Sequence, residues 1–298
     1  EIGAEATKHQ TREDLASIVT SEDFDAVVAF GSIRAIRHGR ICRQTIAKSR
    51  YQANSSRARV RLRERDLLPW FCVIPGVGGL PDPCLDSSAG AAYKTEPPSV
   101  IICDPALIAD AEPADEARTF ATTLGRCLAA LGCDVFNPMA DGLATEGLRR
   151  LQLLEQLERS DKPSHSRELM AAMLNGAIAQ QKGPGLIQIL AHELTKITGR
   201  ETDGASLQSV LLPAFLRERE VIPENEESRV ARILGLARSA DLPDAIQQLL
   251  DPLPLARSLR DLGVSLEELR AAAQVADNTK GHWRPMQGRL ASVLEDHY

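Results

Sequence analysis

The sequence predicts an α/β domain with a parallel sheet in residues 1–104, followed by an all-helical domain in residues 105–298. The first part contains three short, continuous apolar runs that end near glycine or proline, which is typical of buried parallel strands. The second part consists of segments with apolar residues at helical spacing, separated by glycine and proline. Aromatic residues make up only 4% of the chain, so Leu, Ala, Ile and Val must build the core. This composition favours helix packing.

The first part alternates between helical and strand-like patterns. "TREDLASIVTSED" has apolar residues at helical spacing, and the apolar run in "DAVVAFGS" follows it. "WFCVIPGVGG" and "PSVIICDP" repeat the pattern of an apolar run that ends at a turn. Strands that alternate with helices at this spacing predict βαβ units and a parallel sheet.

The second part is predicted to be helical throughout. Its boundary with the first part falls near "CDPALIADAEP". The expected helices cover residues 116–131, 139–159, 166–181, 185–198, 207–220, 227–238, 242–250, 253–263, 265–277 and 286–297.

Charge and hydropathy exclude several classes of protein. The net charge of -6 argues against a surface that binds nucleic acid throughout. No stretch reaches the roughly 18 consecutive apolar residues that cross a bilayer, so no membrane partner is expected. The opening "EIGAEATKHQTRED" is too polar for a signal peptide. The six cysteines contain no CxxC pair and are expected to be reduced and mostly buried, which suggests the cytoplasm.

An arginine-rich stretch spans residues 34–65, with ten arginines, one lysine and no acid before Glu64. From Arg57 to Arg65 the arginines occupy odd positions, so a strand would present them on one face. A contact with phosphate or nucleic acid is one interpretation. A solvated edge or loop is the favoured one, because charge runs usually face water.

Several motifs, in matching order, carry a family resemblance. "NPMADGLATEGLRRL" at 137–151 is the most specific, and "VIICDPAL", "SVLLPAFLRE" and "LPLARSLRDLGVSLEELRAAAQVAD" accompany it. Together they resemble the iron-containing alcohol dehydrogenase superfamily. The resemblance implies a nucleotide-binding α/β domain followed by a helical domain. Members of the family begin with roughly one more strand–helix–strand, so the sheet is expected to lack its first strands.

The resemblance implies an NAD(P) site in the first domain. The family's Gly-Gly-Gly-Ser turn matches Gly31 and Ser32, but Ile33 would crowd the backbone that approaches the pyrophosphate. Arg37 stands where the family carries an acid, although arginines can also grip phosphate.

A second cofactor loop of the family matches "PGVGGLPD", with Gly76, Val77 and Gly78 in the turn. The hydroxyl side chains of that loop are missing, so a plain structural turn is the favoured alternative. NAD(P) binding is therefore expected to be weak, with a dissociation constant for NADH above about 10 µM, or roughly -7 kcal/mol.

The resemblance also implies an iron or zinc site in the helical domain. The four ligand positions match Cys127, Leu131, Gln188 and Asp203. Leucine cannot bind a metal and an amide oxygen is a poor ligand for these ions, so the metal is expected to be absent. A rearranged site formed by Cys127, Asp203 and His192 is the alternative.

His192 is the candidate catalytic residue. The matching histidine of the family faces the nicotinamide end of the cleft, where it can relay a proton, and histidine titrates near neutrality. The alternative is a helix histidine that forms hydrogen bonds inside the core.

Three functions follow as hypotheses. The first is an alcohol dehydrogenase-like oxidoreductase with weakened NAD(P) binding and no metal. The second is an inactive pseudoenzyme that serves as a binding or assembly partner, and the third is a different chemistry at Cys127, His192 or Asp203. The expected partners are a small-molecule substrate or a protein, with a homodimer as one option, and neither nucleic acid nor membrane is expected.

Overall fold

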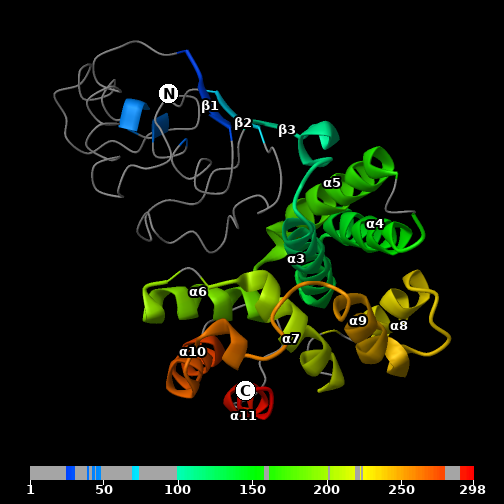
Figure 1. The fold of residues 1–298 in the computed structure, drawn as a ribbon, viewed down its shortest axis with the longest axis vertical. Helices are drawn as coiled ribbons and strands as arrows, with labels where there is room; N and C mark the ends of the chain where they lie inside the picture. Colours follow the sequence, from blue (N-terminus) through cyan, green and yellow to red (C-terminus); the bar gives the residue numbers. More distant parts are fainter. Residues whose placement is uncertain are drawn as a thin grey trace. The chain divides into compact units, whose positions relative to one another are not determined.

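The computed structural model describes the helical part of the chain almost completely and the first part in short segments. The described residues are 25–30, 39, 42, 43, 45–47, 69–73, 99–157, 161–200, 202–218, 222, 224–278 and 289–298. They fall into two compact units (Figure 1): residues 1–76 with 96–104, and residues 77–95 with 105–298. The predicted division into two functional domains stays a prediction.

The first unit contains a parallel sheet. Its strands are β1 (Val27–Phe30), β2 (Trp70–Val73) and β3 (Val100–Ile102), in the order β1-β2-β3. Both neighbouring pairs are parallel. The three predicted strands therefore form where the apolar runs place them.

One face of this sheet is apolar and exposed in the described residues. Val28 and Phe30 alternate along β1 with exposed fractions of 64% and 61%, whereas Ala29 between them is buried. Val100 and Ile102 continue the exposed face on β3. The alternation follows from the two-residue period of a strand.

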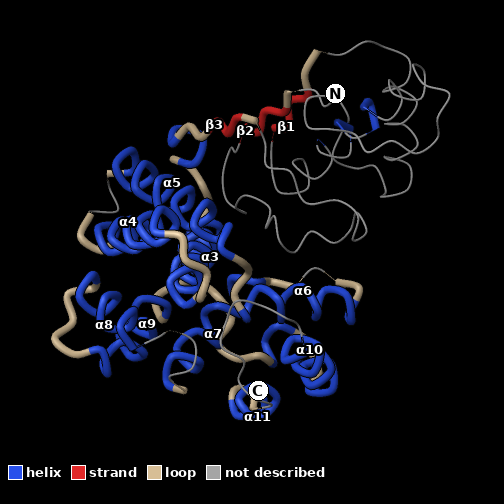
Figure 2. The backbone as a smooth tube through the Cα atoms, turned by 180° about the vertical axis from the view of Figure 1, so that it is seen from behind, coloured by secondary structure: helices blue, strands red, loops and turns tan. Residues whose placement is uncertain are grey.

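The second unit is built from α-helices (Figure 2). They are α3 (Pro113–Gly132), α4 (Pro138–Leu154), α5 (Lys162–Ala179), α6 (Leu186–Thr198), α7 (Gly204–Arg217), α8 (Glu224–Ile233), α9 (Leu242–Leu250), α10 (Leu266–Asn278) and α11 (Leu290–Asp296). Short 3-10 turns join several of them: η3 (Pro105–Ile108), η4 (Gln180–Lys182), η5 (Ser239–Asp241) and η6 (Arg260–Leu262). Within the residues described, none of these helices combines the length and apolar character needed to span a bilayer.

Local side chains explain where the helices begin. The Asn137 side chain accepts a hydrogen bond from the backbone N–H of Ala140 at 3.1 Å and so caps α4. Asp161 caps α5 in the same way. Proline occupies the first turn of α3, α4 and α5, where its missing N–H has no helical partner to lose.

Residues 253–263 contradict the predicted helix. This segment forms turns and the short η6, and it ends at Gly263 in the left-handed region (φ 66°). Pro254 has no N–H to donate and pushes the preceding residue out of the helical region. The Asp261 side chain accepts the backbone N–H of Ser258 at 3.0 Å, so a local turn replaces the helical hydrogen bonds.

Helix α3 lies at the centre of the core. It contacts α4, α5 and α7 (Figures 1 and 2). Leu124 and Leu128 on it are fully buried. Most other core side chains are Leu and Ala, with Phe215 the largest among the fully buried ones. The aliphatic core expected from the composition is thus present in the second unit.

Candidate functional site

The five positions assigned to the NAD(P) site lie outside the described residues: Gly31, Ser32, Gly76, Val77 and Gly78. Ile33, Arg37 and most of the arginine-rich stretch lie outside them as well. The candidate site is therefore built from the helical unit.

Cys127 lies on the face of α3 that packs against α4 and α5. A Cβ added at Gly147 of α4 would lie 2.7 Å from its Sγ atom, and one at Gly176 of α5 would lie 3.2 Å away. The side chain is fully buried, and burial raises the pKa of the Cys127 thiol to about 12. Because the thiolate is the metal ligand and nucleophile, a thiol kept neutral in this way is poorly suited to either role.

Leu131 follows one turn later and also belongs to the buried core. Residues four apart share a helix face, so Leu131 continues the face of Cys127. Across α3, Ala129 lies against Gly185 instead, since a Cβ added at Gly185 would be 2.6 Å from the Cβ of Ala129. The structure therefore places Cys127 and Gln188 against different faces of α3. The match of Cys127 and Leu131 to the family's ligand positions stays a prediction.

Gln188 lies in the first turn of α6, close to α3. Its carboxamide oxygen lies so close to Gly185 that a Cβ added at this glycine would collide with it. Both Nε2 and Oε1 are buried, and neither has a hydrogen-bond partner in the described part of the chain. Buried polar atoms are normally paired, so this side chain is a candidate for binding something from outside the protein.

The segment before α6 is anchored by the ion pair of a buried lysine. Lys182 of η4 is almost fully buried, and its Nζ lies 2.6 Å from the Asp141 carboxylate of α4. The Cys133 thiol, at the end of α3, donates to the backbone carbonyl of Lys182 at 3.5 Å. These contacts fix the chain just before Gly185 and thereby position the start of α6.

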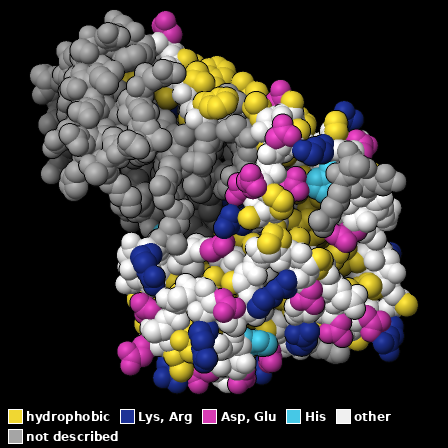
Figure 3. Space-filling view, in the orientation of Figure 1, with side chains coloured by type: hydrophobic (Ala, Val, Ile, Leu, Met, Phe, Trp, Pro, Cys, Tyr) yellow, Lys and Arg dark blue, Asp and Glu magenta, His cyan; other side chains and the backbone are white. Residues whose placement is uncertain are grey.

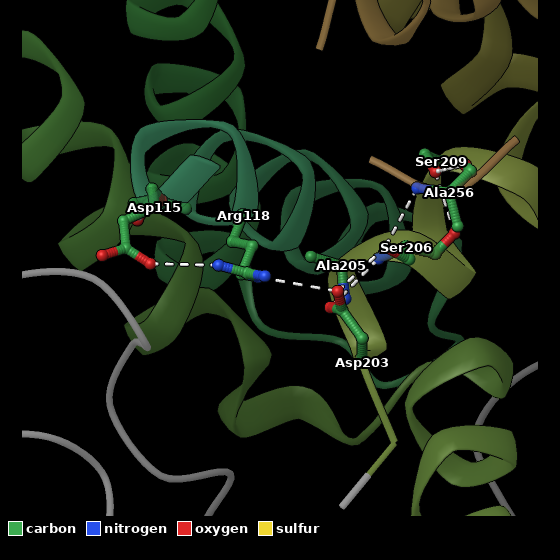
Figure 4. A network of polar contacts seen from close by, with 8 residues as sticks. Asp115, Arg118, Asp203, Ala205, Ser206, Ser209 and Ala256 are labelled. Carbon is green, nitrogen blue, oxygen red and sulfur yellow. Dashed lines mark hydrogen bonds and ion pairs between the residues drawn. The ribbon is translucent and has the colours of Figure 1, made fainter. Parts of the chain in front are cut away.

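Asp203 begins α7 and acts as its cap (Figure 4). Its Oδ1 accepts the backbone N–H groups of Ala205 and Ser206 at 3.1 and 3.3 Å. Its Oδ2 accepts the Ser206 hydroxyl at 2.9 Å and lies 3.5 Å from Nε of Arg118 on α3. The carboxylate therefore links the start of α7 to α3.

These donors do not fit an iron or zinc ion. The four positions supply a buried neutral thiol, a hydrocarbon, an amide and a carboxylate that already caps a helix. Among the described residues, His, Cys, Asp and Glu form no group of three or more that could hold a metal. The absence of metal itself stays a prediction.

His192 lies half-buried on α6, one turn after Gln188. Positions four apart share a helix face, so His192 follows Gln188 on the side of α6 that begins at the cavity described next. Its proposed role as a proton relay stays a prediction.

A small cavity lies between α3, α6 and α7, and sequence reasoning missed it. Its volume is about 30 Å³, and it is lined by Gly125, Ala129, Gly132, Gly185, Leu186, Ile187, Gln188, Gln208, Leu212 and Phe215. Gln208 of α7 is 97% buried, having an exposed fraction of 3%, and its Oε1 has no partner among the described residues. The small residues of α3 at positions 125, 129 and 132 share one helix face, and this pattern is the signal that could have revealed the cavity.

The surface of the helical unit carries mixed charge. In the view of Figure 3, basic and acidic side chains are interspersed across this unit. Arg150 lies 2.8 Å from Glu146 and 2.7 Å from Glu168, and Arg149 also pairs with Glu146. Charges of both signs are thus interspersed on this face of the helical unit.

Comparisons with known proteins identify the fold. No family model matches the chain. The 4-hydroxybutyrate dehydrogenase of Cupriavidus necator is 31% identical over 179 residues, which are 56% of this chain and 46% of that protein. The match thus spans about half the length of this curated relative.

Solved structures share the fold along the whole chain at low identity. Sulfoacetaldehyde reductase from Bifidobacterium kashiwanohense, solved in complex with NAD+, superposes with a TM-score of 0.76 at 16% identity, covering 100% of this chain and 82% of that one. The iron-containing alcohol dehydrogenase from Corynebacterium glutamicum gives 0.71 at 18% identity, covering 100% and 80%. A 1,3-propanediol oxidoreductase gives 0.75 at 18% identity, covering 100% and 83%.

Replacing Asp203 with Ala is expected to lower the free energy of unfolding by about 0.5–2 kcal/mol, because α7 loses its cap. Asp203→Asn is the matched control, since an asparagine oxygen still accepts the N–H groups of Ala205 and Ser206. Chemical denaturation of the two variants measures the difference. Equal stability of the Ala and Asn variants would show that the cap contributes nothing.

Proposed function

We propose that the chain is an alcohol dehydrogenase-like oxidoreductase of the iron-containing alcohol dehydrogenase superfamily that works without a bound metal. The fold that it shares with solved members and its similarity to a 4-hydroxybutyrate dehydrogenase support the assignment. Its NAD(P) site is weakened relative to the family. The proposal goes beyond the fold, because fold alone is a poor guide to function.

One observation carries the metal-free part of the proposal. Two residues matched to the metal positions already have structural roles. Cys127 packs between α3 and the helices α4 and α5, and Asp203 caps α7. Leu131 is part of the apolar core, which disfavours a nearby charged ion. A divalent ion usually needs three or four good donors, and these positions do not supply them.

The reaction would be a reversible hydride transfer. When bound, NAD(P)+ would supply the hydride acceptor for the alcohol carbon, and the hydroxyl proton would leave to a base, so that an aldehyde or ketone and NAD(P)H would form. We assign the base to His192, which lies on α6 one turn from Gln188. In place of a metal, neutral hydrogen-bond donors have to stabilise the reacting oxygen.

The relative's name suggests the first substrate to test. That protein is called a 4-hydroxybutyrate dehydrogenase, and 4-hydroxybutyrate is an alcohol that this reaction type would oxidise. We therefore propose a small hydroxy compound as substrate, with 4-hydroxybutyrate as the first candidate.

The alternative is a catalytically inactive pseudoenzyme that binds a protein partner or a second copy of itself. The structural roles of Cys127 and Asp203 also support this alternative. A protein without catalytic activity would still need residues that pack its core and cap its helices. Cofactor-dependent turnover separates the two functions.

Chelation is expected to leave turnover unchanged. The protein is treated with EDTA, passed through gel filtration and assayed with 4-hydroxybutyrate and NAD+ or NADP+, before and after addition of Fe2+ or Zn2+. Because the donors do not fit a metal, neither treatment should change the rate. Loss of turnover on chelation, with recovery on adding Fe2+, would contradict the metal-free proposal, and absence of turnover throughout would favour the pseudoenzyme.

Replacing His192 with Gln is expected to lower kcat by about 10²–10⁴-fold, since proton transfer by a positioned side chain contributes that much. The rise of oxidation rate with pH that a histidine base produces should disappear in the variant. His165→Gln on α5 is the matched control, as His165 lies in the same unit, 3.8 Å from Glu116. An equal effect of both substitutions, or an unchanged pH profile, would exclude His192 as the base.

A further inference from the structure

We propose that the cavity between α3, α6 and α7 binds the uncharged hydroxyl end of a small alcohol through the carboxamides of Gln188 and Gln208. The proposal rests on the proposed function for the identity of the alcohol as substrate. Binding at the cavity can nevertheless be measured without cofactor or turnover.

The cavity has room for a small polar group. Its volume of about 30 Å³ exceeds the roughly 10–15 Å³ that a single water molecule needs. Leu186, Ile187, Leu212 and Phe215 supply apolar walls, and Gly125, Ala129, Gly132 and Gly185 leave the space open. The dimensions suit the end of an aliphatic chain that carries one polar group.

Three buried polar atoms at this cavity have no hydrogen-bond partner in the described structure: Nε2 and Oε1 of Gln188 and Oε1 of Gln208. Leaving such atoms unpaired in a folded protein is costly, so an occupant that pairs with them is stabilised there. Gln208 is almost fully buried, which excludes bulk solvent as its ordinary partner.

The two carboxamides, from α6 and α7, lie against neighbouring turns of α3. That of Gln208 lies directly over Gly125, where it would collide with an added Cβ. That of Gln188 lies by Gly185, which packs against Ala129, four residues after Gly125. Both carboxamides therefore lie along the face of α3 that Gly125 and Ala129 present to the cavity.

A hydroxyl group matches these atoms better than an ion does. The unpaired atoms include both a donor nitrogen and acceptor oxygens, and a hydroxyl both accepts and donates. A carboxylate only accepts, and a metal ion would need charged or imidazole donors that the cavity lining does not supply. The apolar walls further disfavour a full charge.

The test uses two isomeric probes in NMR titrations of the full chain. 1-Butanol carries a hydroxyl, whereas 1-methoxypropane has the same composition and can accept but not donate a hydrogen bond. Shifts of the side-chain amide signals of Gln188 and Gln208 report binding. The expected result is saturable binding of 1-butanol, with 1-methoxypropane at least tenfold weaker.

Glycine substitutions locate the site. Gly125→Ala places a methyl group where the Gln208 carboxamide now lies and should abolish 1-butanol binding. Gly142→Ala on α4 is the matched control, because a Cβ added there meets nothing within 4 Å. Gln208→Leu, which keeps the side chain near its size but removes the amide, should weaken 1-butanol binding at least tenfold.

Thermal unfolding of each variant identifies substitutions that disturb the fold. If Gly125→Ala disturbs the fold, Gln208→Leu still tests the proposal. Equal binding of the two probes, absence of saturable binding, or binding that survives both Gly125→Ala and Gln208→Leu would overturn the proposal. Binding as expected in a protein without turnover would preserve this site and reject the oxidoreductase function.

Discussion

The close packing of α3 is the constraint on which the helical unit depends. This helix is contacted on one side by α4 and α5 and on another by α7. Neighbouring helices can come this near only where small residues meet, and Cys127 fills the contact between Gly147 and Gly176. Interiors packed to this density tolerate little added volume, and extra methylene groups typically cost about 1–3 kcal/mol. Cys127 is therefore explained by packing without any chemical role.

On the opposite side of α3, small residues leave a cavity. There Gly125 and Ala129 leave space that the side chains on α6 and α7 do not fill, and two carboxamides lie at its edge. Asp203 and Arg118 hold the start of α7 against α3, so the positions of these amides are tied to the central helix. Neutral dipoles set in a fixed apolar frame suit a polar, uncharged ligand group.

The sequence was sufficient for the parts governed by local rules. Apolar runs located the three strands, and the Asn137 and Pro138 pair marked the start of α4, because capping and turn chemistry depend on neighbouring residues. The helix expected at 253–263 failed since the side chain of Asp261 formed a turn that periodicity does not register.

The site was harder to predict because ligand spacing does not reveal which helix face meets which neighbour. Cys127 and Leu131 have the right separation but face α4 and α5, whereas Gly125 and Ala129 line the cavity. Gln208 had no signal in the sequence at all, as a single glutamine in a helix resembles any exposed one. Its proposed role in binding follows only from its burial at the cavity between α3, α6 and α7.

The proposed function depends on a neutral amide pocket between α3, α6 and α7 that binds no metal ion. Anomalous diffraction tests it most directly, from crystals grown with Fe2+ under anaerobic conditions and with Zn2+. The account predicts no anomalous peak within coordination distance of Gln188, Gln208 or His192. A full-occupancy peak bound by any of these side chains would contradict it.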